Sequence, residues 1–194
     1  MGLRIDRKKD KRVVHACTHN LADIPNGVTV CSADLVAGGV LQEGTVIGKD
    51  EAGLFHAVKT ARVTEAATDA ATSYKVAKGH HFKKGDFVML KVGGKAYAVT
   101  GIDSSEATHD TITVDTTLGE VVKVGDALVE AKKAQAASGA AFKYKPKAMT
   151  GDSYDVEALN NHFVTAVTIG QFKESVIPAV SDDIKAALPG IVLI

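Results

Sequence analysis

The hydrophobic and polar positions of this chain form a short phrase that occurs three times. Each copy has an apolar residue, two mostly polar residues, Gly, then Asp or Thr, and then two or three apolar residues, and the copies occupy residues 41–47, 82–88 and 122–128. Gly adopts positive φ angles without a Cβ clash, and an Asp side chain can accept hydrogen bonds from nearby backbone N–H groups. The apolar residues favour extended backbone. The phrase therefore predicts a tight turn that leads into a strand. The predicted turn residues are Gly44, Thr45, Gly85, Asp86, Gly125 and Asp126.

The second and third copies correspond over a longer stretch. Both have an upstream glycine, Gly79 or Gly119, and every matching residue of the third copy lies 40 positions after its counterpart. This register predicts a repeated structural unit in which Gly85 and Gly125 adopt equivalent turns that start equivalent strands. The phrase contains no nucleophile, base or set of metal ligands, so it describes a scaffold.

Strand-like segments continue between the copies. Residues 88–92 and 95–99 flank Gly93 and Gly94, a pair that favours a two-residue hairpin turn. Several short strands at intervals of roughly 8–12 residues are typical of a β-sandwich or a small barrel. The sequence therefore predicts a mainly β fold, a small β-barrel or β-sandwich with an N-terminal arm and a small α+β C-terminal segment. Residues 61–71, rich in Ala and Thr, are predicted to form a loop.

We expect three segments along the chain: a basic arm with an extended stretch over residues 1–31, a β-rich domain over 32–131, and a C-terminal segment over 132–194. Residues 131–139 predict either one short helix or a linker. In the last segment, residues 163–169 have the composition of a strand.

A terminal helix is predicted after Ser181. A Ser at this place can act as the N-cap, and Asp182 and Asp183 favour the positive end of a helix. Pro189 and Gly190 then end it. The residues that follow, 191–194, form an apolar tail that should pack on its own domain, on a neighbouring subunit or on a larger assembly.

Composition and charge narrow the function classes. The 23 Lys and Arg residues balance 23 Asp and Glu residues, and a formal net charge of zero disfavours nucleic acid as the main partner. Aromatic residues are only 5% of the chain and Trp is absent, which favours a core of Val, Ile, Leu and Ala and burial between subunits. Two cysteines are too few for a secreted disulfide scaffold. With neither a signal peptide nor a membrane span in the sequence, we expect synthesis in the bacterial cytoplasm and no membrane partner.

The first 12 residues are strongly basic, with six Lys and Arg residues against two Asp residues. Two interpretations stay open: a solvated arm, or an electrostatic tether to an acidic surface. The residues predicted to contact a partner are Arg7, Lys8, Lys9, Lys11 and Arg12.

The strongest metal candidate in the sequence is the alternation of His15, Cys17 and His19. On a regular strand these three side chains would share one face. Zinc would need a fourth ligand such as Cys31, and the close ligand spacing of common zinc sites is absent. We therefore interpret these residues as part of an exposed strand, with Cys17 as a small hydrophobic residue, and predict no metal and no cofactor.

Catalytic motifs are equally weak. His80 and His81 are neighbours and would point to opposite faces of a strand, and a single catalytic His would lack a nucleophile motif or paired acids. Residues 104–110 are explained by turn formation. The glycine pairs match neither a phosphate loop nor a dinucleotide fingerprint. We predict no catalytic and no cofactor-binding residues.

Residues 44–50, followed by the second copy of the phrase and its hairpin, resemble β-rich proteins that decorate phage capsids, and are similar to head-fibre or auxiliary capsid proteins of phages and prophages. The resemblance covers about residues 30–131. It implies a non-enzymatic virion structural protein that binds phage capsid proteins, and a homo-oligomer, with a trimer favoured. Two alternatives stay open: a small β-barrel that binds nucleic acid or the ribosome, supported by the locally basic residues 83–95, and an enzyme with a site at a subunit interface.

Overall fold

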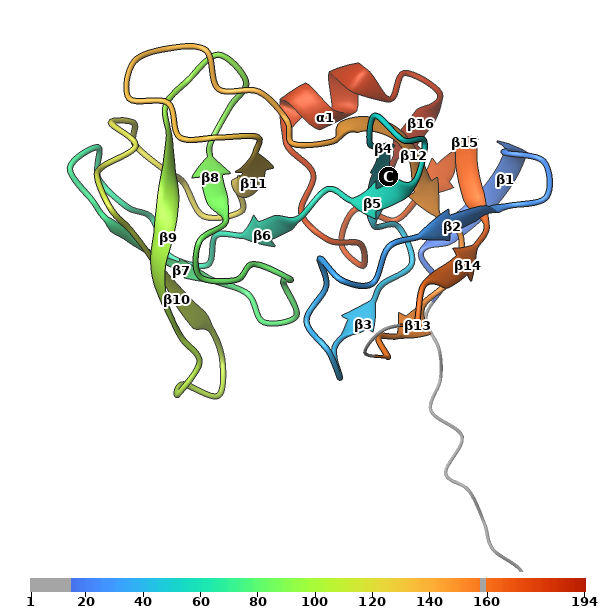
Figure 1. Ribbon diagram of the computed structural model, residues 1–194, viewed down its shortest axis with the longest axis horizontal. Coiled ribbons are helices and arrows are strands. Elements are labelled where there is room, and N and C mark those ends of the chain that lie inside the picture. The colour runs from blue at the N-terminus through green and yellow to red at the C-terminus, as the bar shows by residue number, and fades with distance from the viewer. Residues whose placement is uncertain (1–14, 158–159) are drawn as a thin grey trace, which may run out of the picture.

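The computed structural model describes residues 15–157 and 160–194, and over these residues it has sixteen strands and one short helix (Figure 1). The predicted fold class, mainly β with a barrel or sandwich, is confirmed. The basic arm, with Arg7, Lys8, Lys9, Lys11 and Arg12, lies outside the described residues. Within residues 15–157 and 160–194 no helix has the length and hydrophobicity that crossing a bilayer requires.

One half of the molecule, here called the sheet unit, is built on an eight-stranded sheet. Its strands are β1 (Cys17–Asp23), β2 (Val28–Val30), β4 (Val46–Lys49), β5 (Phe55–Ala57), β12 (Lys145–Thr150), β14 (His162–Val164), β15 (Ala166–Phe172) and β16 (Ile191–Leu193). The order is β1-β15-β12-β4-β5-β2-β14, and β16 also pairs with β15. The pairs β2/β5 and β15/β16 are parallel. A two-stranded pair, β3 (Val40–Leu41) with β13 (Tyr154–Asp155), and helix α1 (Asp182–Ala187) complete the unit.

The other half, here called the barrel unit, contains six strands. They are β6 (Thr60–Arg62), β7 (Ser73–Val76), β8 (Phe87–Met89), β9 (Ala96–Asp103), β10 (Asp110–Val114) and β11 (Ala127–Ala131), in the order β6-β11-β8-β9-β10-β7. The two edges of this sheet meet, because Thr64 N donates to Lys75 O at 2.9 Å and Ala77 N donates to Arg62 O at 2.8 Å. The sheet therefore curls onto itself as a small barrel (Figure 1).

The strand pairing groups the chain differently from the three segments expected from the sequence. The barrel unit takes residues 60–131. Residues 40–57, which belong to the expected segment 32–131, instead provide β3, β4 and β5 of the sheet unit. These strands pair with β2 and with the C-terminal β12 and β13. The barrel unit is thus inserted between β5 and β12 of a sheet whose strands come from both ends of the described chain.

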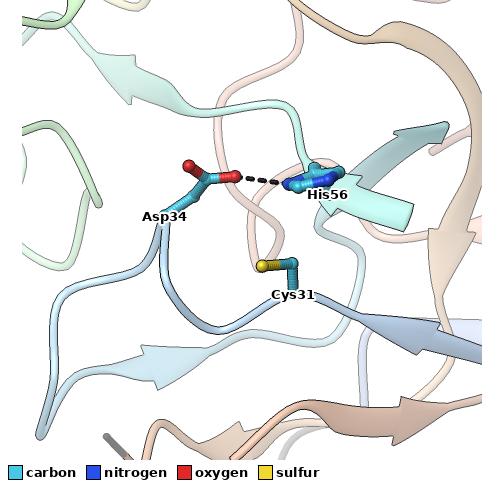
Figure 2. Close-up of side chains that lie close together, drawn as sticks. All are labelled: Cys31, Asp34 and His56. Atoms are coloured by element: carbon cyan, nitrogen blue, oxygen red, sulfur yellow. Dashed lines mark hydrogen bonds and ion pairs between the residues drawn. The ribbon is translucent and has the colours of Figure 1, made fainter. Parts of the chain in front are cut away.

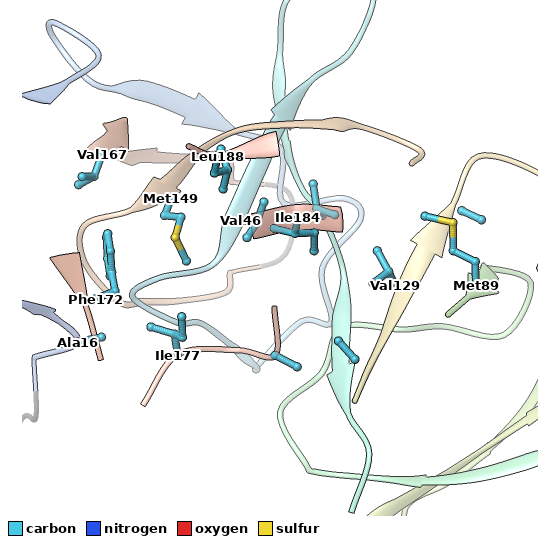
Figure 3. Close-up of a cluster of buried hydrophobic side chains, with 14 of the residues drawn as sticks. Ala16, Val46, Met89, Val129, Met149, Val167, Phe172, Ile177, Ile184 and Leu188 are labelled. Atoms are coloured by element: carbon cyan, nitrogen blue, oxygen red, sulfur yellow. The ribbon is translucent and has the colours of Figure 1, made fainter. Parts of the chain in front are cut away.

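The two units share an apolar core. Met89 and Val129 of the barrel unit belong to the same buried cluster as Val46, Met149 and Ile184 of the sheet unit (Figure 3). Further clusters fill the barrel and the opposite side of the sheet unit. Removal of this much apolar surface from water holds the units together.

The repeated phrase forms equivalent turns, as predicted. Gly85 and Gly125 both have φ of +95°, and the upstream Gly79 and Gly119 have φ of +87° and +73°. In each copy the Asp Oδ2 accepts from the backbone N–H three residues earlier, at 2.7 Å. The turns lead directly into β8 and β11, which are neighbours in the barrel. Gly44 has φ of +81°. Thr45 N donates to Gln42 O at 3.1 Å, which makes the first copy a turn of the same kind.

The C-terminal helix begins where the sequence predicts. α1 begins after Ser181, whose Oγ accepts from Ile184 N at 3.3 Å, with Asp182 and Asp183 in the first turn. The apolar tail becomes β16, in which Ile191 and Leu193 pack on the shared core while Val192 is 55% exposed.

The structure decides or refines three local predictions. Of the two interpretations of residues 131–139, a short helix or a linker, the structure has the linker, because Gln135 pairs with Ala96 through two backbone hydrogen bonds of 2.7 and 2.9 Å. The predicted hairpin forms, since β8 pairs antiparallel with β9, but its turn is longer than two residues. Gly93 and Gly94 lie in a connection over residues 90–95, where Gly93 N donates to Ala140 O. The expected loop at 61–71 lies outside the named strands and helix except for its first two residues, Ala61 and Arg62, which belong to β6.

Candidate functional site

The three residues of the sequence-based metal candidate do not converge. His15 is exposed and its Nδ1 lies 3.5 Å from Glu43 Oε2. His19 is exposed and its Nδ1 lies 3.2 Å from Gln171 Oε1. The strand register shifts between Cys17 and His19. A bulge of this kind breaks the alternation on which the shared face depended.

A different set of side chains converges beside the parallel pair β2/β5. Cys31 directly follows β2, and its N–H donates to Phe55 O at 2.8 Å, which sets it next to His56 of β5. Asp34 lies three residues further along the loop. One ligand atom from each of Cys31, Asp34 and His56 lies within 4.8 Å of the others. Figure 2 shows the Cys31 sulfur directed toward the space beside Asp34 and His56.

The imidazole of His56 lies between two carboxylates. Nδ1 is hydrogen-bonded to Asp34 Oδ2, and Nε2 lies 3.2 Å from Asp50 Oδ2. The ring stacks on Tyr144, with centroids 4.2 Å apart and planes 11° from parallel. Asp50 is itself held by the β4–β5 connection, because its Oδ1 accepts from Leu54 N at 2.8 Å. The two carboxylates at its nitrogens and the stacked Tyr144 ring therefore determine the orientation of the His56 imidazole.

Charged side chains extend this cluster into the contact between the two units. Lys143 Nζ lies 3.7 Å from Asp34 Oδ1 and 2.9 Å from Glu130 Oε1. Lys59 Nζ lies 3.4 Å from the same Glu130 oxygen and 2.7 Å from Asp86 Oδ2. The side chains of Lys59 and Glu130 are each only 1% exposed. We call the set the junction network; its members are Asp50, His56, Asp34, Lys143, Glu130, Lys59 and Asp86.

Burial and charge shift several groups of the junction network. Burial acts to raise the pKa of Asp34, but the hydrogen bond with His56 and the charge of Lys143 outweigh it and hold the pKa below its usual range. Burial raises the pKa of Glu130, despite the charges of Lys59 and Lys143. Burial and the neighbouring Asp34 raise the pKa of Tyr144 to about 12, so its hydroxyl stays protonated and donates to Asp34 Oδ2 at 3.2 Å.

His80 and His81 lie in the connection between β7 and β8, outside the strands. His81 joins the two units: its Nδ1 accepts from Val36 N at 3.2 Å, and Nε2 lies 3.0 Å from Val40 O. Burial lowers the pKa of both rings. Since the Val36 contact uses the lone pair of Nδ1, His81 is the neutral tautomer with hydrogen on Nε2.

Sequence reasoning missed Asp34 and His56 as partners of Cys31. The spacing of Cys31 and Asp34, with two residues between them, is a local signal that could have suggested a ligand pair. His56 lies 25 residues after Cys31 in the sequence, and only the pairing of β2 with β5 brings it there. Among the turn residues, Asp86 lies in the junction network and Asp126 does not.

The molecule is therefore a mainly β protein made of a curled sheet unit and an inserted barrel, with a buried polar network where they meet. Comparisons with models of protein families, with curated proteins and with solved structures found no significant match.

Proposed function

We propose that this chain is a non-enzymatic virion structural protein, a capsid decoration or head-fibre component that binds a phage capsid surface and acts in the virion. The resemblance of residues 30–131 to such proteins motivates the class. The observation that carries the proposal is an exposed apolar face on the sheet unit. A face of this kind serves assembly with another protein surface rather than catalysis.

The apolar face crosses three neighbouring strands. Leu21 of β1 is 77% exposed, Ile169 of β15 is 47% exposed, and Val192 of β16 is 55% exposed. Ile194 continues the face with 58% exposure. A groove of about 320 Å³ runs between these side chains. Clustered apolar residues on the surface of a small protein are characteristic of interaction sites.

We propose that a second copy of the same chain occupies this face. β1 lies at the end of the strand order, so its outer edge offers backbone N–H and C=O groups for pairing with another strand. The formal net charge of zero means that identical copies do not repel one another through their overall charge. Self-association would bury the apolar side chains and the strand edge together. The resemblance favours a trimer as the final assembly.

Light scattering coupled to size-exclusion chromatography tests this assembly. The variant Leu21→Asp/Ile169→Asp places charges on the apolar face, and we expect it to be monomeric while the unchanged protein forms oligomers. Val121→Asp/Val124→Asp is the matched control, since these residues are 66% and 64% exposed on the barrel unit, and it should assemble normally. A monomeric unchanged protein at high concentration, or an oligomeric face variant, would contradict the proposal.

Binding to a capsid is tested, where a major capsid gene lies in the neighbourhood of this gene, with particles assembled from that capsid protein. We expect the protein to sediment with these particles. A gene neighbourhood without a capsid or portal gene, or failure to sediment with the particles, would remove the decoration function. The light-scattering experiment would still test self-association through the apolar face, because it does not depend on capsid binding.

The basic arm is proposed to contribute to capsid binding by contact with an acidic surface. We expect neutralisation of Arg7, Lys8, Lys9, Lys11 and Arg12 to weaken binding and to reduce its dependence on salt, because charge pairing at solvated surfaces is screened by ions. Affinity that stays unchanged in this variant and across a wide salt range would show that the arm is inert.

A further inference from the structure

We propose that Cys31, Asp34 and His56 form a zinc site, with water as the fourth ligand. Their ligand atoms already lie within 4.8 Å of one another (Figure 2). Zinc bonds of about 2.0–2.3 Å in tetrahedral geometry require ligand atoms about 3.3–3.8 Å apart. Small side-chain shifts of about 1 Å therefore suffice to close the site, while β2 and β5 hold the backbone of Cys31 and His56 in place.

The surroundings of His56 are those of a metal-ligating imidazole. Such a ring donates its other N–H to a carboxylate or carbonyl, which determines the tautomer. Asp50 Oδ2, 3.2 Å from Nε2, is this acceptor. Nδ1 shares a hydrogen with Asp34 until the ion displaces it, and its lone pair, directed toward Asp34, is then available to the ion. Stacking on Tyr144 keeps the ring from turning away.

The carboxylate of Asp34 is supported in the same manner. Tyr144 donates to Oδ2 at 3.2 Å, and Lys143 Nζ lies 3.7 Å from Oδ1. The charge of Lys143 is directed chiefly at Glu130, to which it hydrogen-bonds at 2.9 Å. Oδ2, which is hydrogen-bonded to His56 Nδ1, is the oxygen that would bind the ion.

Charge balance favours a bound cation. The junction network contains the carboxylates of Asp34, Asp50, Glu130 and Asp86 against the two ammonium groups of Lys59 and Lys143. The remaining two carboxylates, Asp34 and Asp50, share only the imidazole of His56, and a divalent cation between Asp34 and His56 would offset the excess of carboxylates. Thiolate and imidazole ligands select zinc over magnesium or calcium, which prefer oxygen ligands.

Binding follows a simple proton balance. The thiol of Cys31 loses its proton to solvent when sulfur binds the ion, and the proton between His56 Nδ1 and Asp34 is likewise displaced. Affinity should therefore increase with pH. Ions can reach the site from solvent, since Cys31 is half-buried and the Asp34 side chain is 22% exposed.

Cobalt substitution tests the site in the full, untagged chain. After removal of metal with a chelator, Co²⁺ should produce a sulfur-to-cobalt charge-transfer band and intense ligand-field bands of a tetrahedral centre, and Zn²⁺ should displace it with one ion per chain. Cys31→Ser should abolish the charge-transfer band. Cys17→Ser is the matched control, because Cys17 is the other half-buried cysteine, and it should retain the band.

The role of Asp50 provides a second readout. Asp50→Asn should keep the charge-transfer band but weaken zinc affinity by about 10- to 100-fold, as loss of a carboxylate partner does in other histidine sites. Circular dichroism on each variant checks that the fold is retained. The absence of a sulfur-to-cobalt band in the unchanged chain, or its persistence in a folded Cys31→Ser variant, would overturn the proposal and leave His56 as an imidazole held between two carboxylates.

Discussion

The three copies of the turn phrase share their backbone geometry but not their surroundings. In the barrel unit, a Cβ atom added to Gly85 or Gly125 would meet no atom within 4 Å. In the sheet unit, the same addition to Gly44 would come within 2.2 Å of Ile177 Cγ2. One sequence signal thus produces the same turn everywhere because the turn is local. Whether the turn glycine also packs against another part of the chain depends on the position of its strand in the fold.

The largest expected effect is a difference in the free energy of unfolding between variants of the turn glycine in the sheet unit and in the barrel unit. Gly44→Ala should reduce the free energy of unfolding by about 2–5 kcal/mol, since left-handed backbone costs about 1–2 kcal/mol for a side chain and overpacking adds about 1–3 kcal/mol. Gly85→Ala and Gly125→Ala are the controls, with an expected loss of about 1–2 kcal/mol each. Denaturant unfolding measures all three. Equal losses would show that the contact with Ile177 has no energetic weight.

A second comparison distinguishes the two barrel copies. Asp86→Asn and Asp126→Asn both keep a side-chain oxygen for the turn hydrogen bond, but only Asp86 pairs with the buried Lys59, at 2.7 Å. We expect a loss of about 1–3 kcal/mol for Asp86→Asn and less than about 0.5 kcal/mol for Asp126→Asn. The measurement is again denaturant unfolding at neutral pH. If the two variants are equally stable, the Lys59 contact contributes nothing beyond the turn.

The smallest expected effect is on the pH dependence of stability, at the residue that precedes the repeated phrase. His81 is buried between the units, whereas Val121, 40 residues later, is 66% exposed. Burial lowers the pKa of His81, so the unfolded chain binds more protons than the folded chain below about pH 6.5. Stability should therefore decrease as pH falls from this value, by at most about 1.4 kcal/mol per pH unit for this group.

The pH effect is checked by urea unfolding between neutral and mildly acidic pH. His81→Gln should flatten the pH dependence, although His80, whose pKa burial also lowers, leaves a remaining slope. His19→Gln, at an exposed histidine, should keep the full slope. An unchanged slope in His81→Gln would mean that this ring does not couple protonation to the contact between the units.

Turns and a helix start could be predicted from the sequence alone. The turns at Gly85 and Gly125 and the start of α1 after Ser181 depend on a few neighbouring residues, and the predictions for them are confirmed. Residues 131–139, for which the sequence left a helix or a linker open, form a linker because pairing of Gln135 with Ala96, far away in the sequence, replaced the helical hydrogen bonds. Long-range pairing of this kind overrides local propensity.

The candidate site shows the same division. Cys31 was noticed in the sequence, but as a fourth ligand for His15, Cys17 and His19, which a bulge in β1 separates. Its actual neighbour, His56, carries no local signal, since only the parallel pairing of β2 with β5 places it beside Cys31.

The sequence by itself determined the mainly β class, the repeated turns and the residues suited to a core, because alternation, glycine and turn chemistry act within a few residues. Only the tertiary structure decided that the barrel is inserted between β5 and β12, that Lys59 meets Asp86 and Glu130, and that Asp34 and His56 meet Cys31. These contacts join residues that are distant along the chain. The Lys59 contacts form because burial of the shared core brings the two units together, whereas Cys31 meets His56 because β2 pairs with β5. No short stretch of sequence encodes either step.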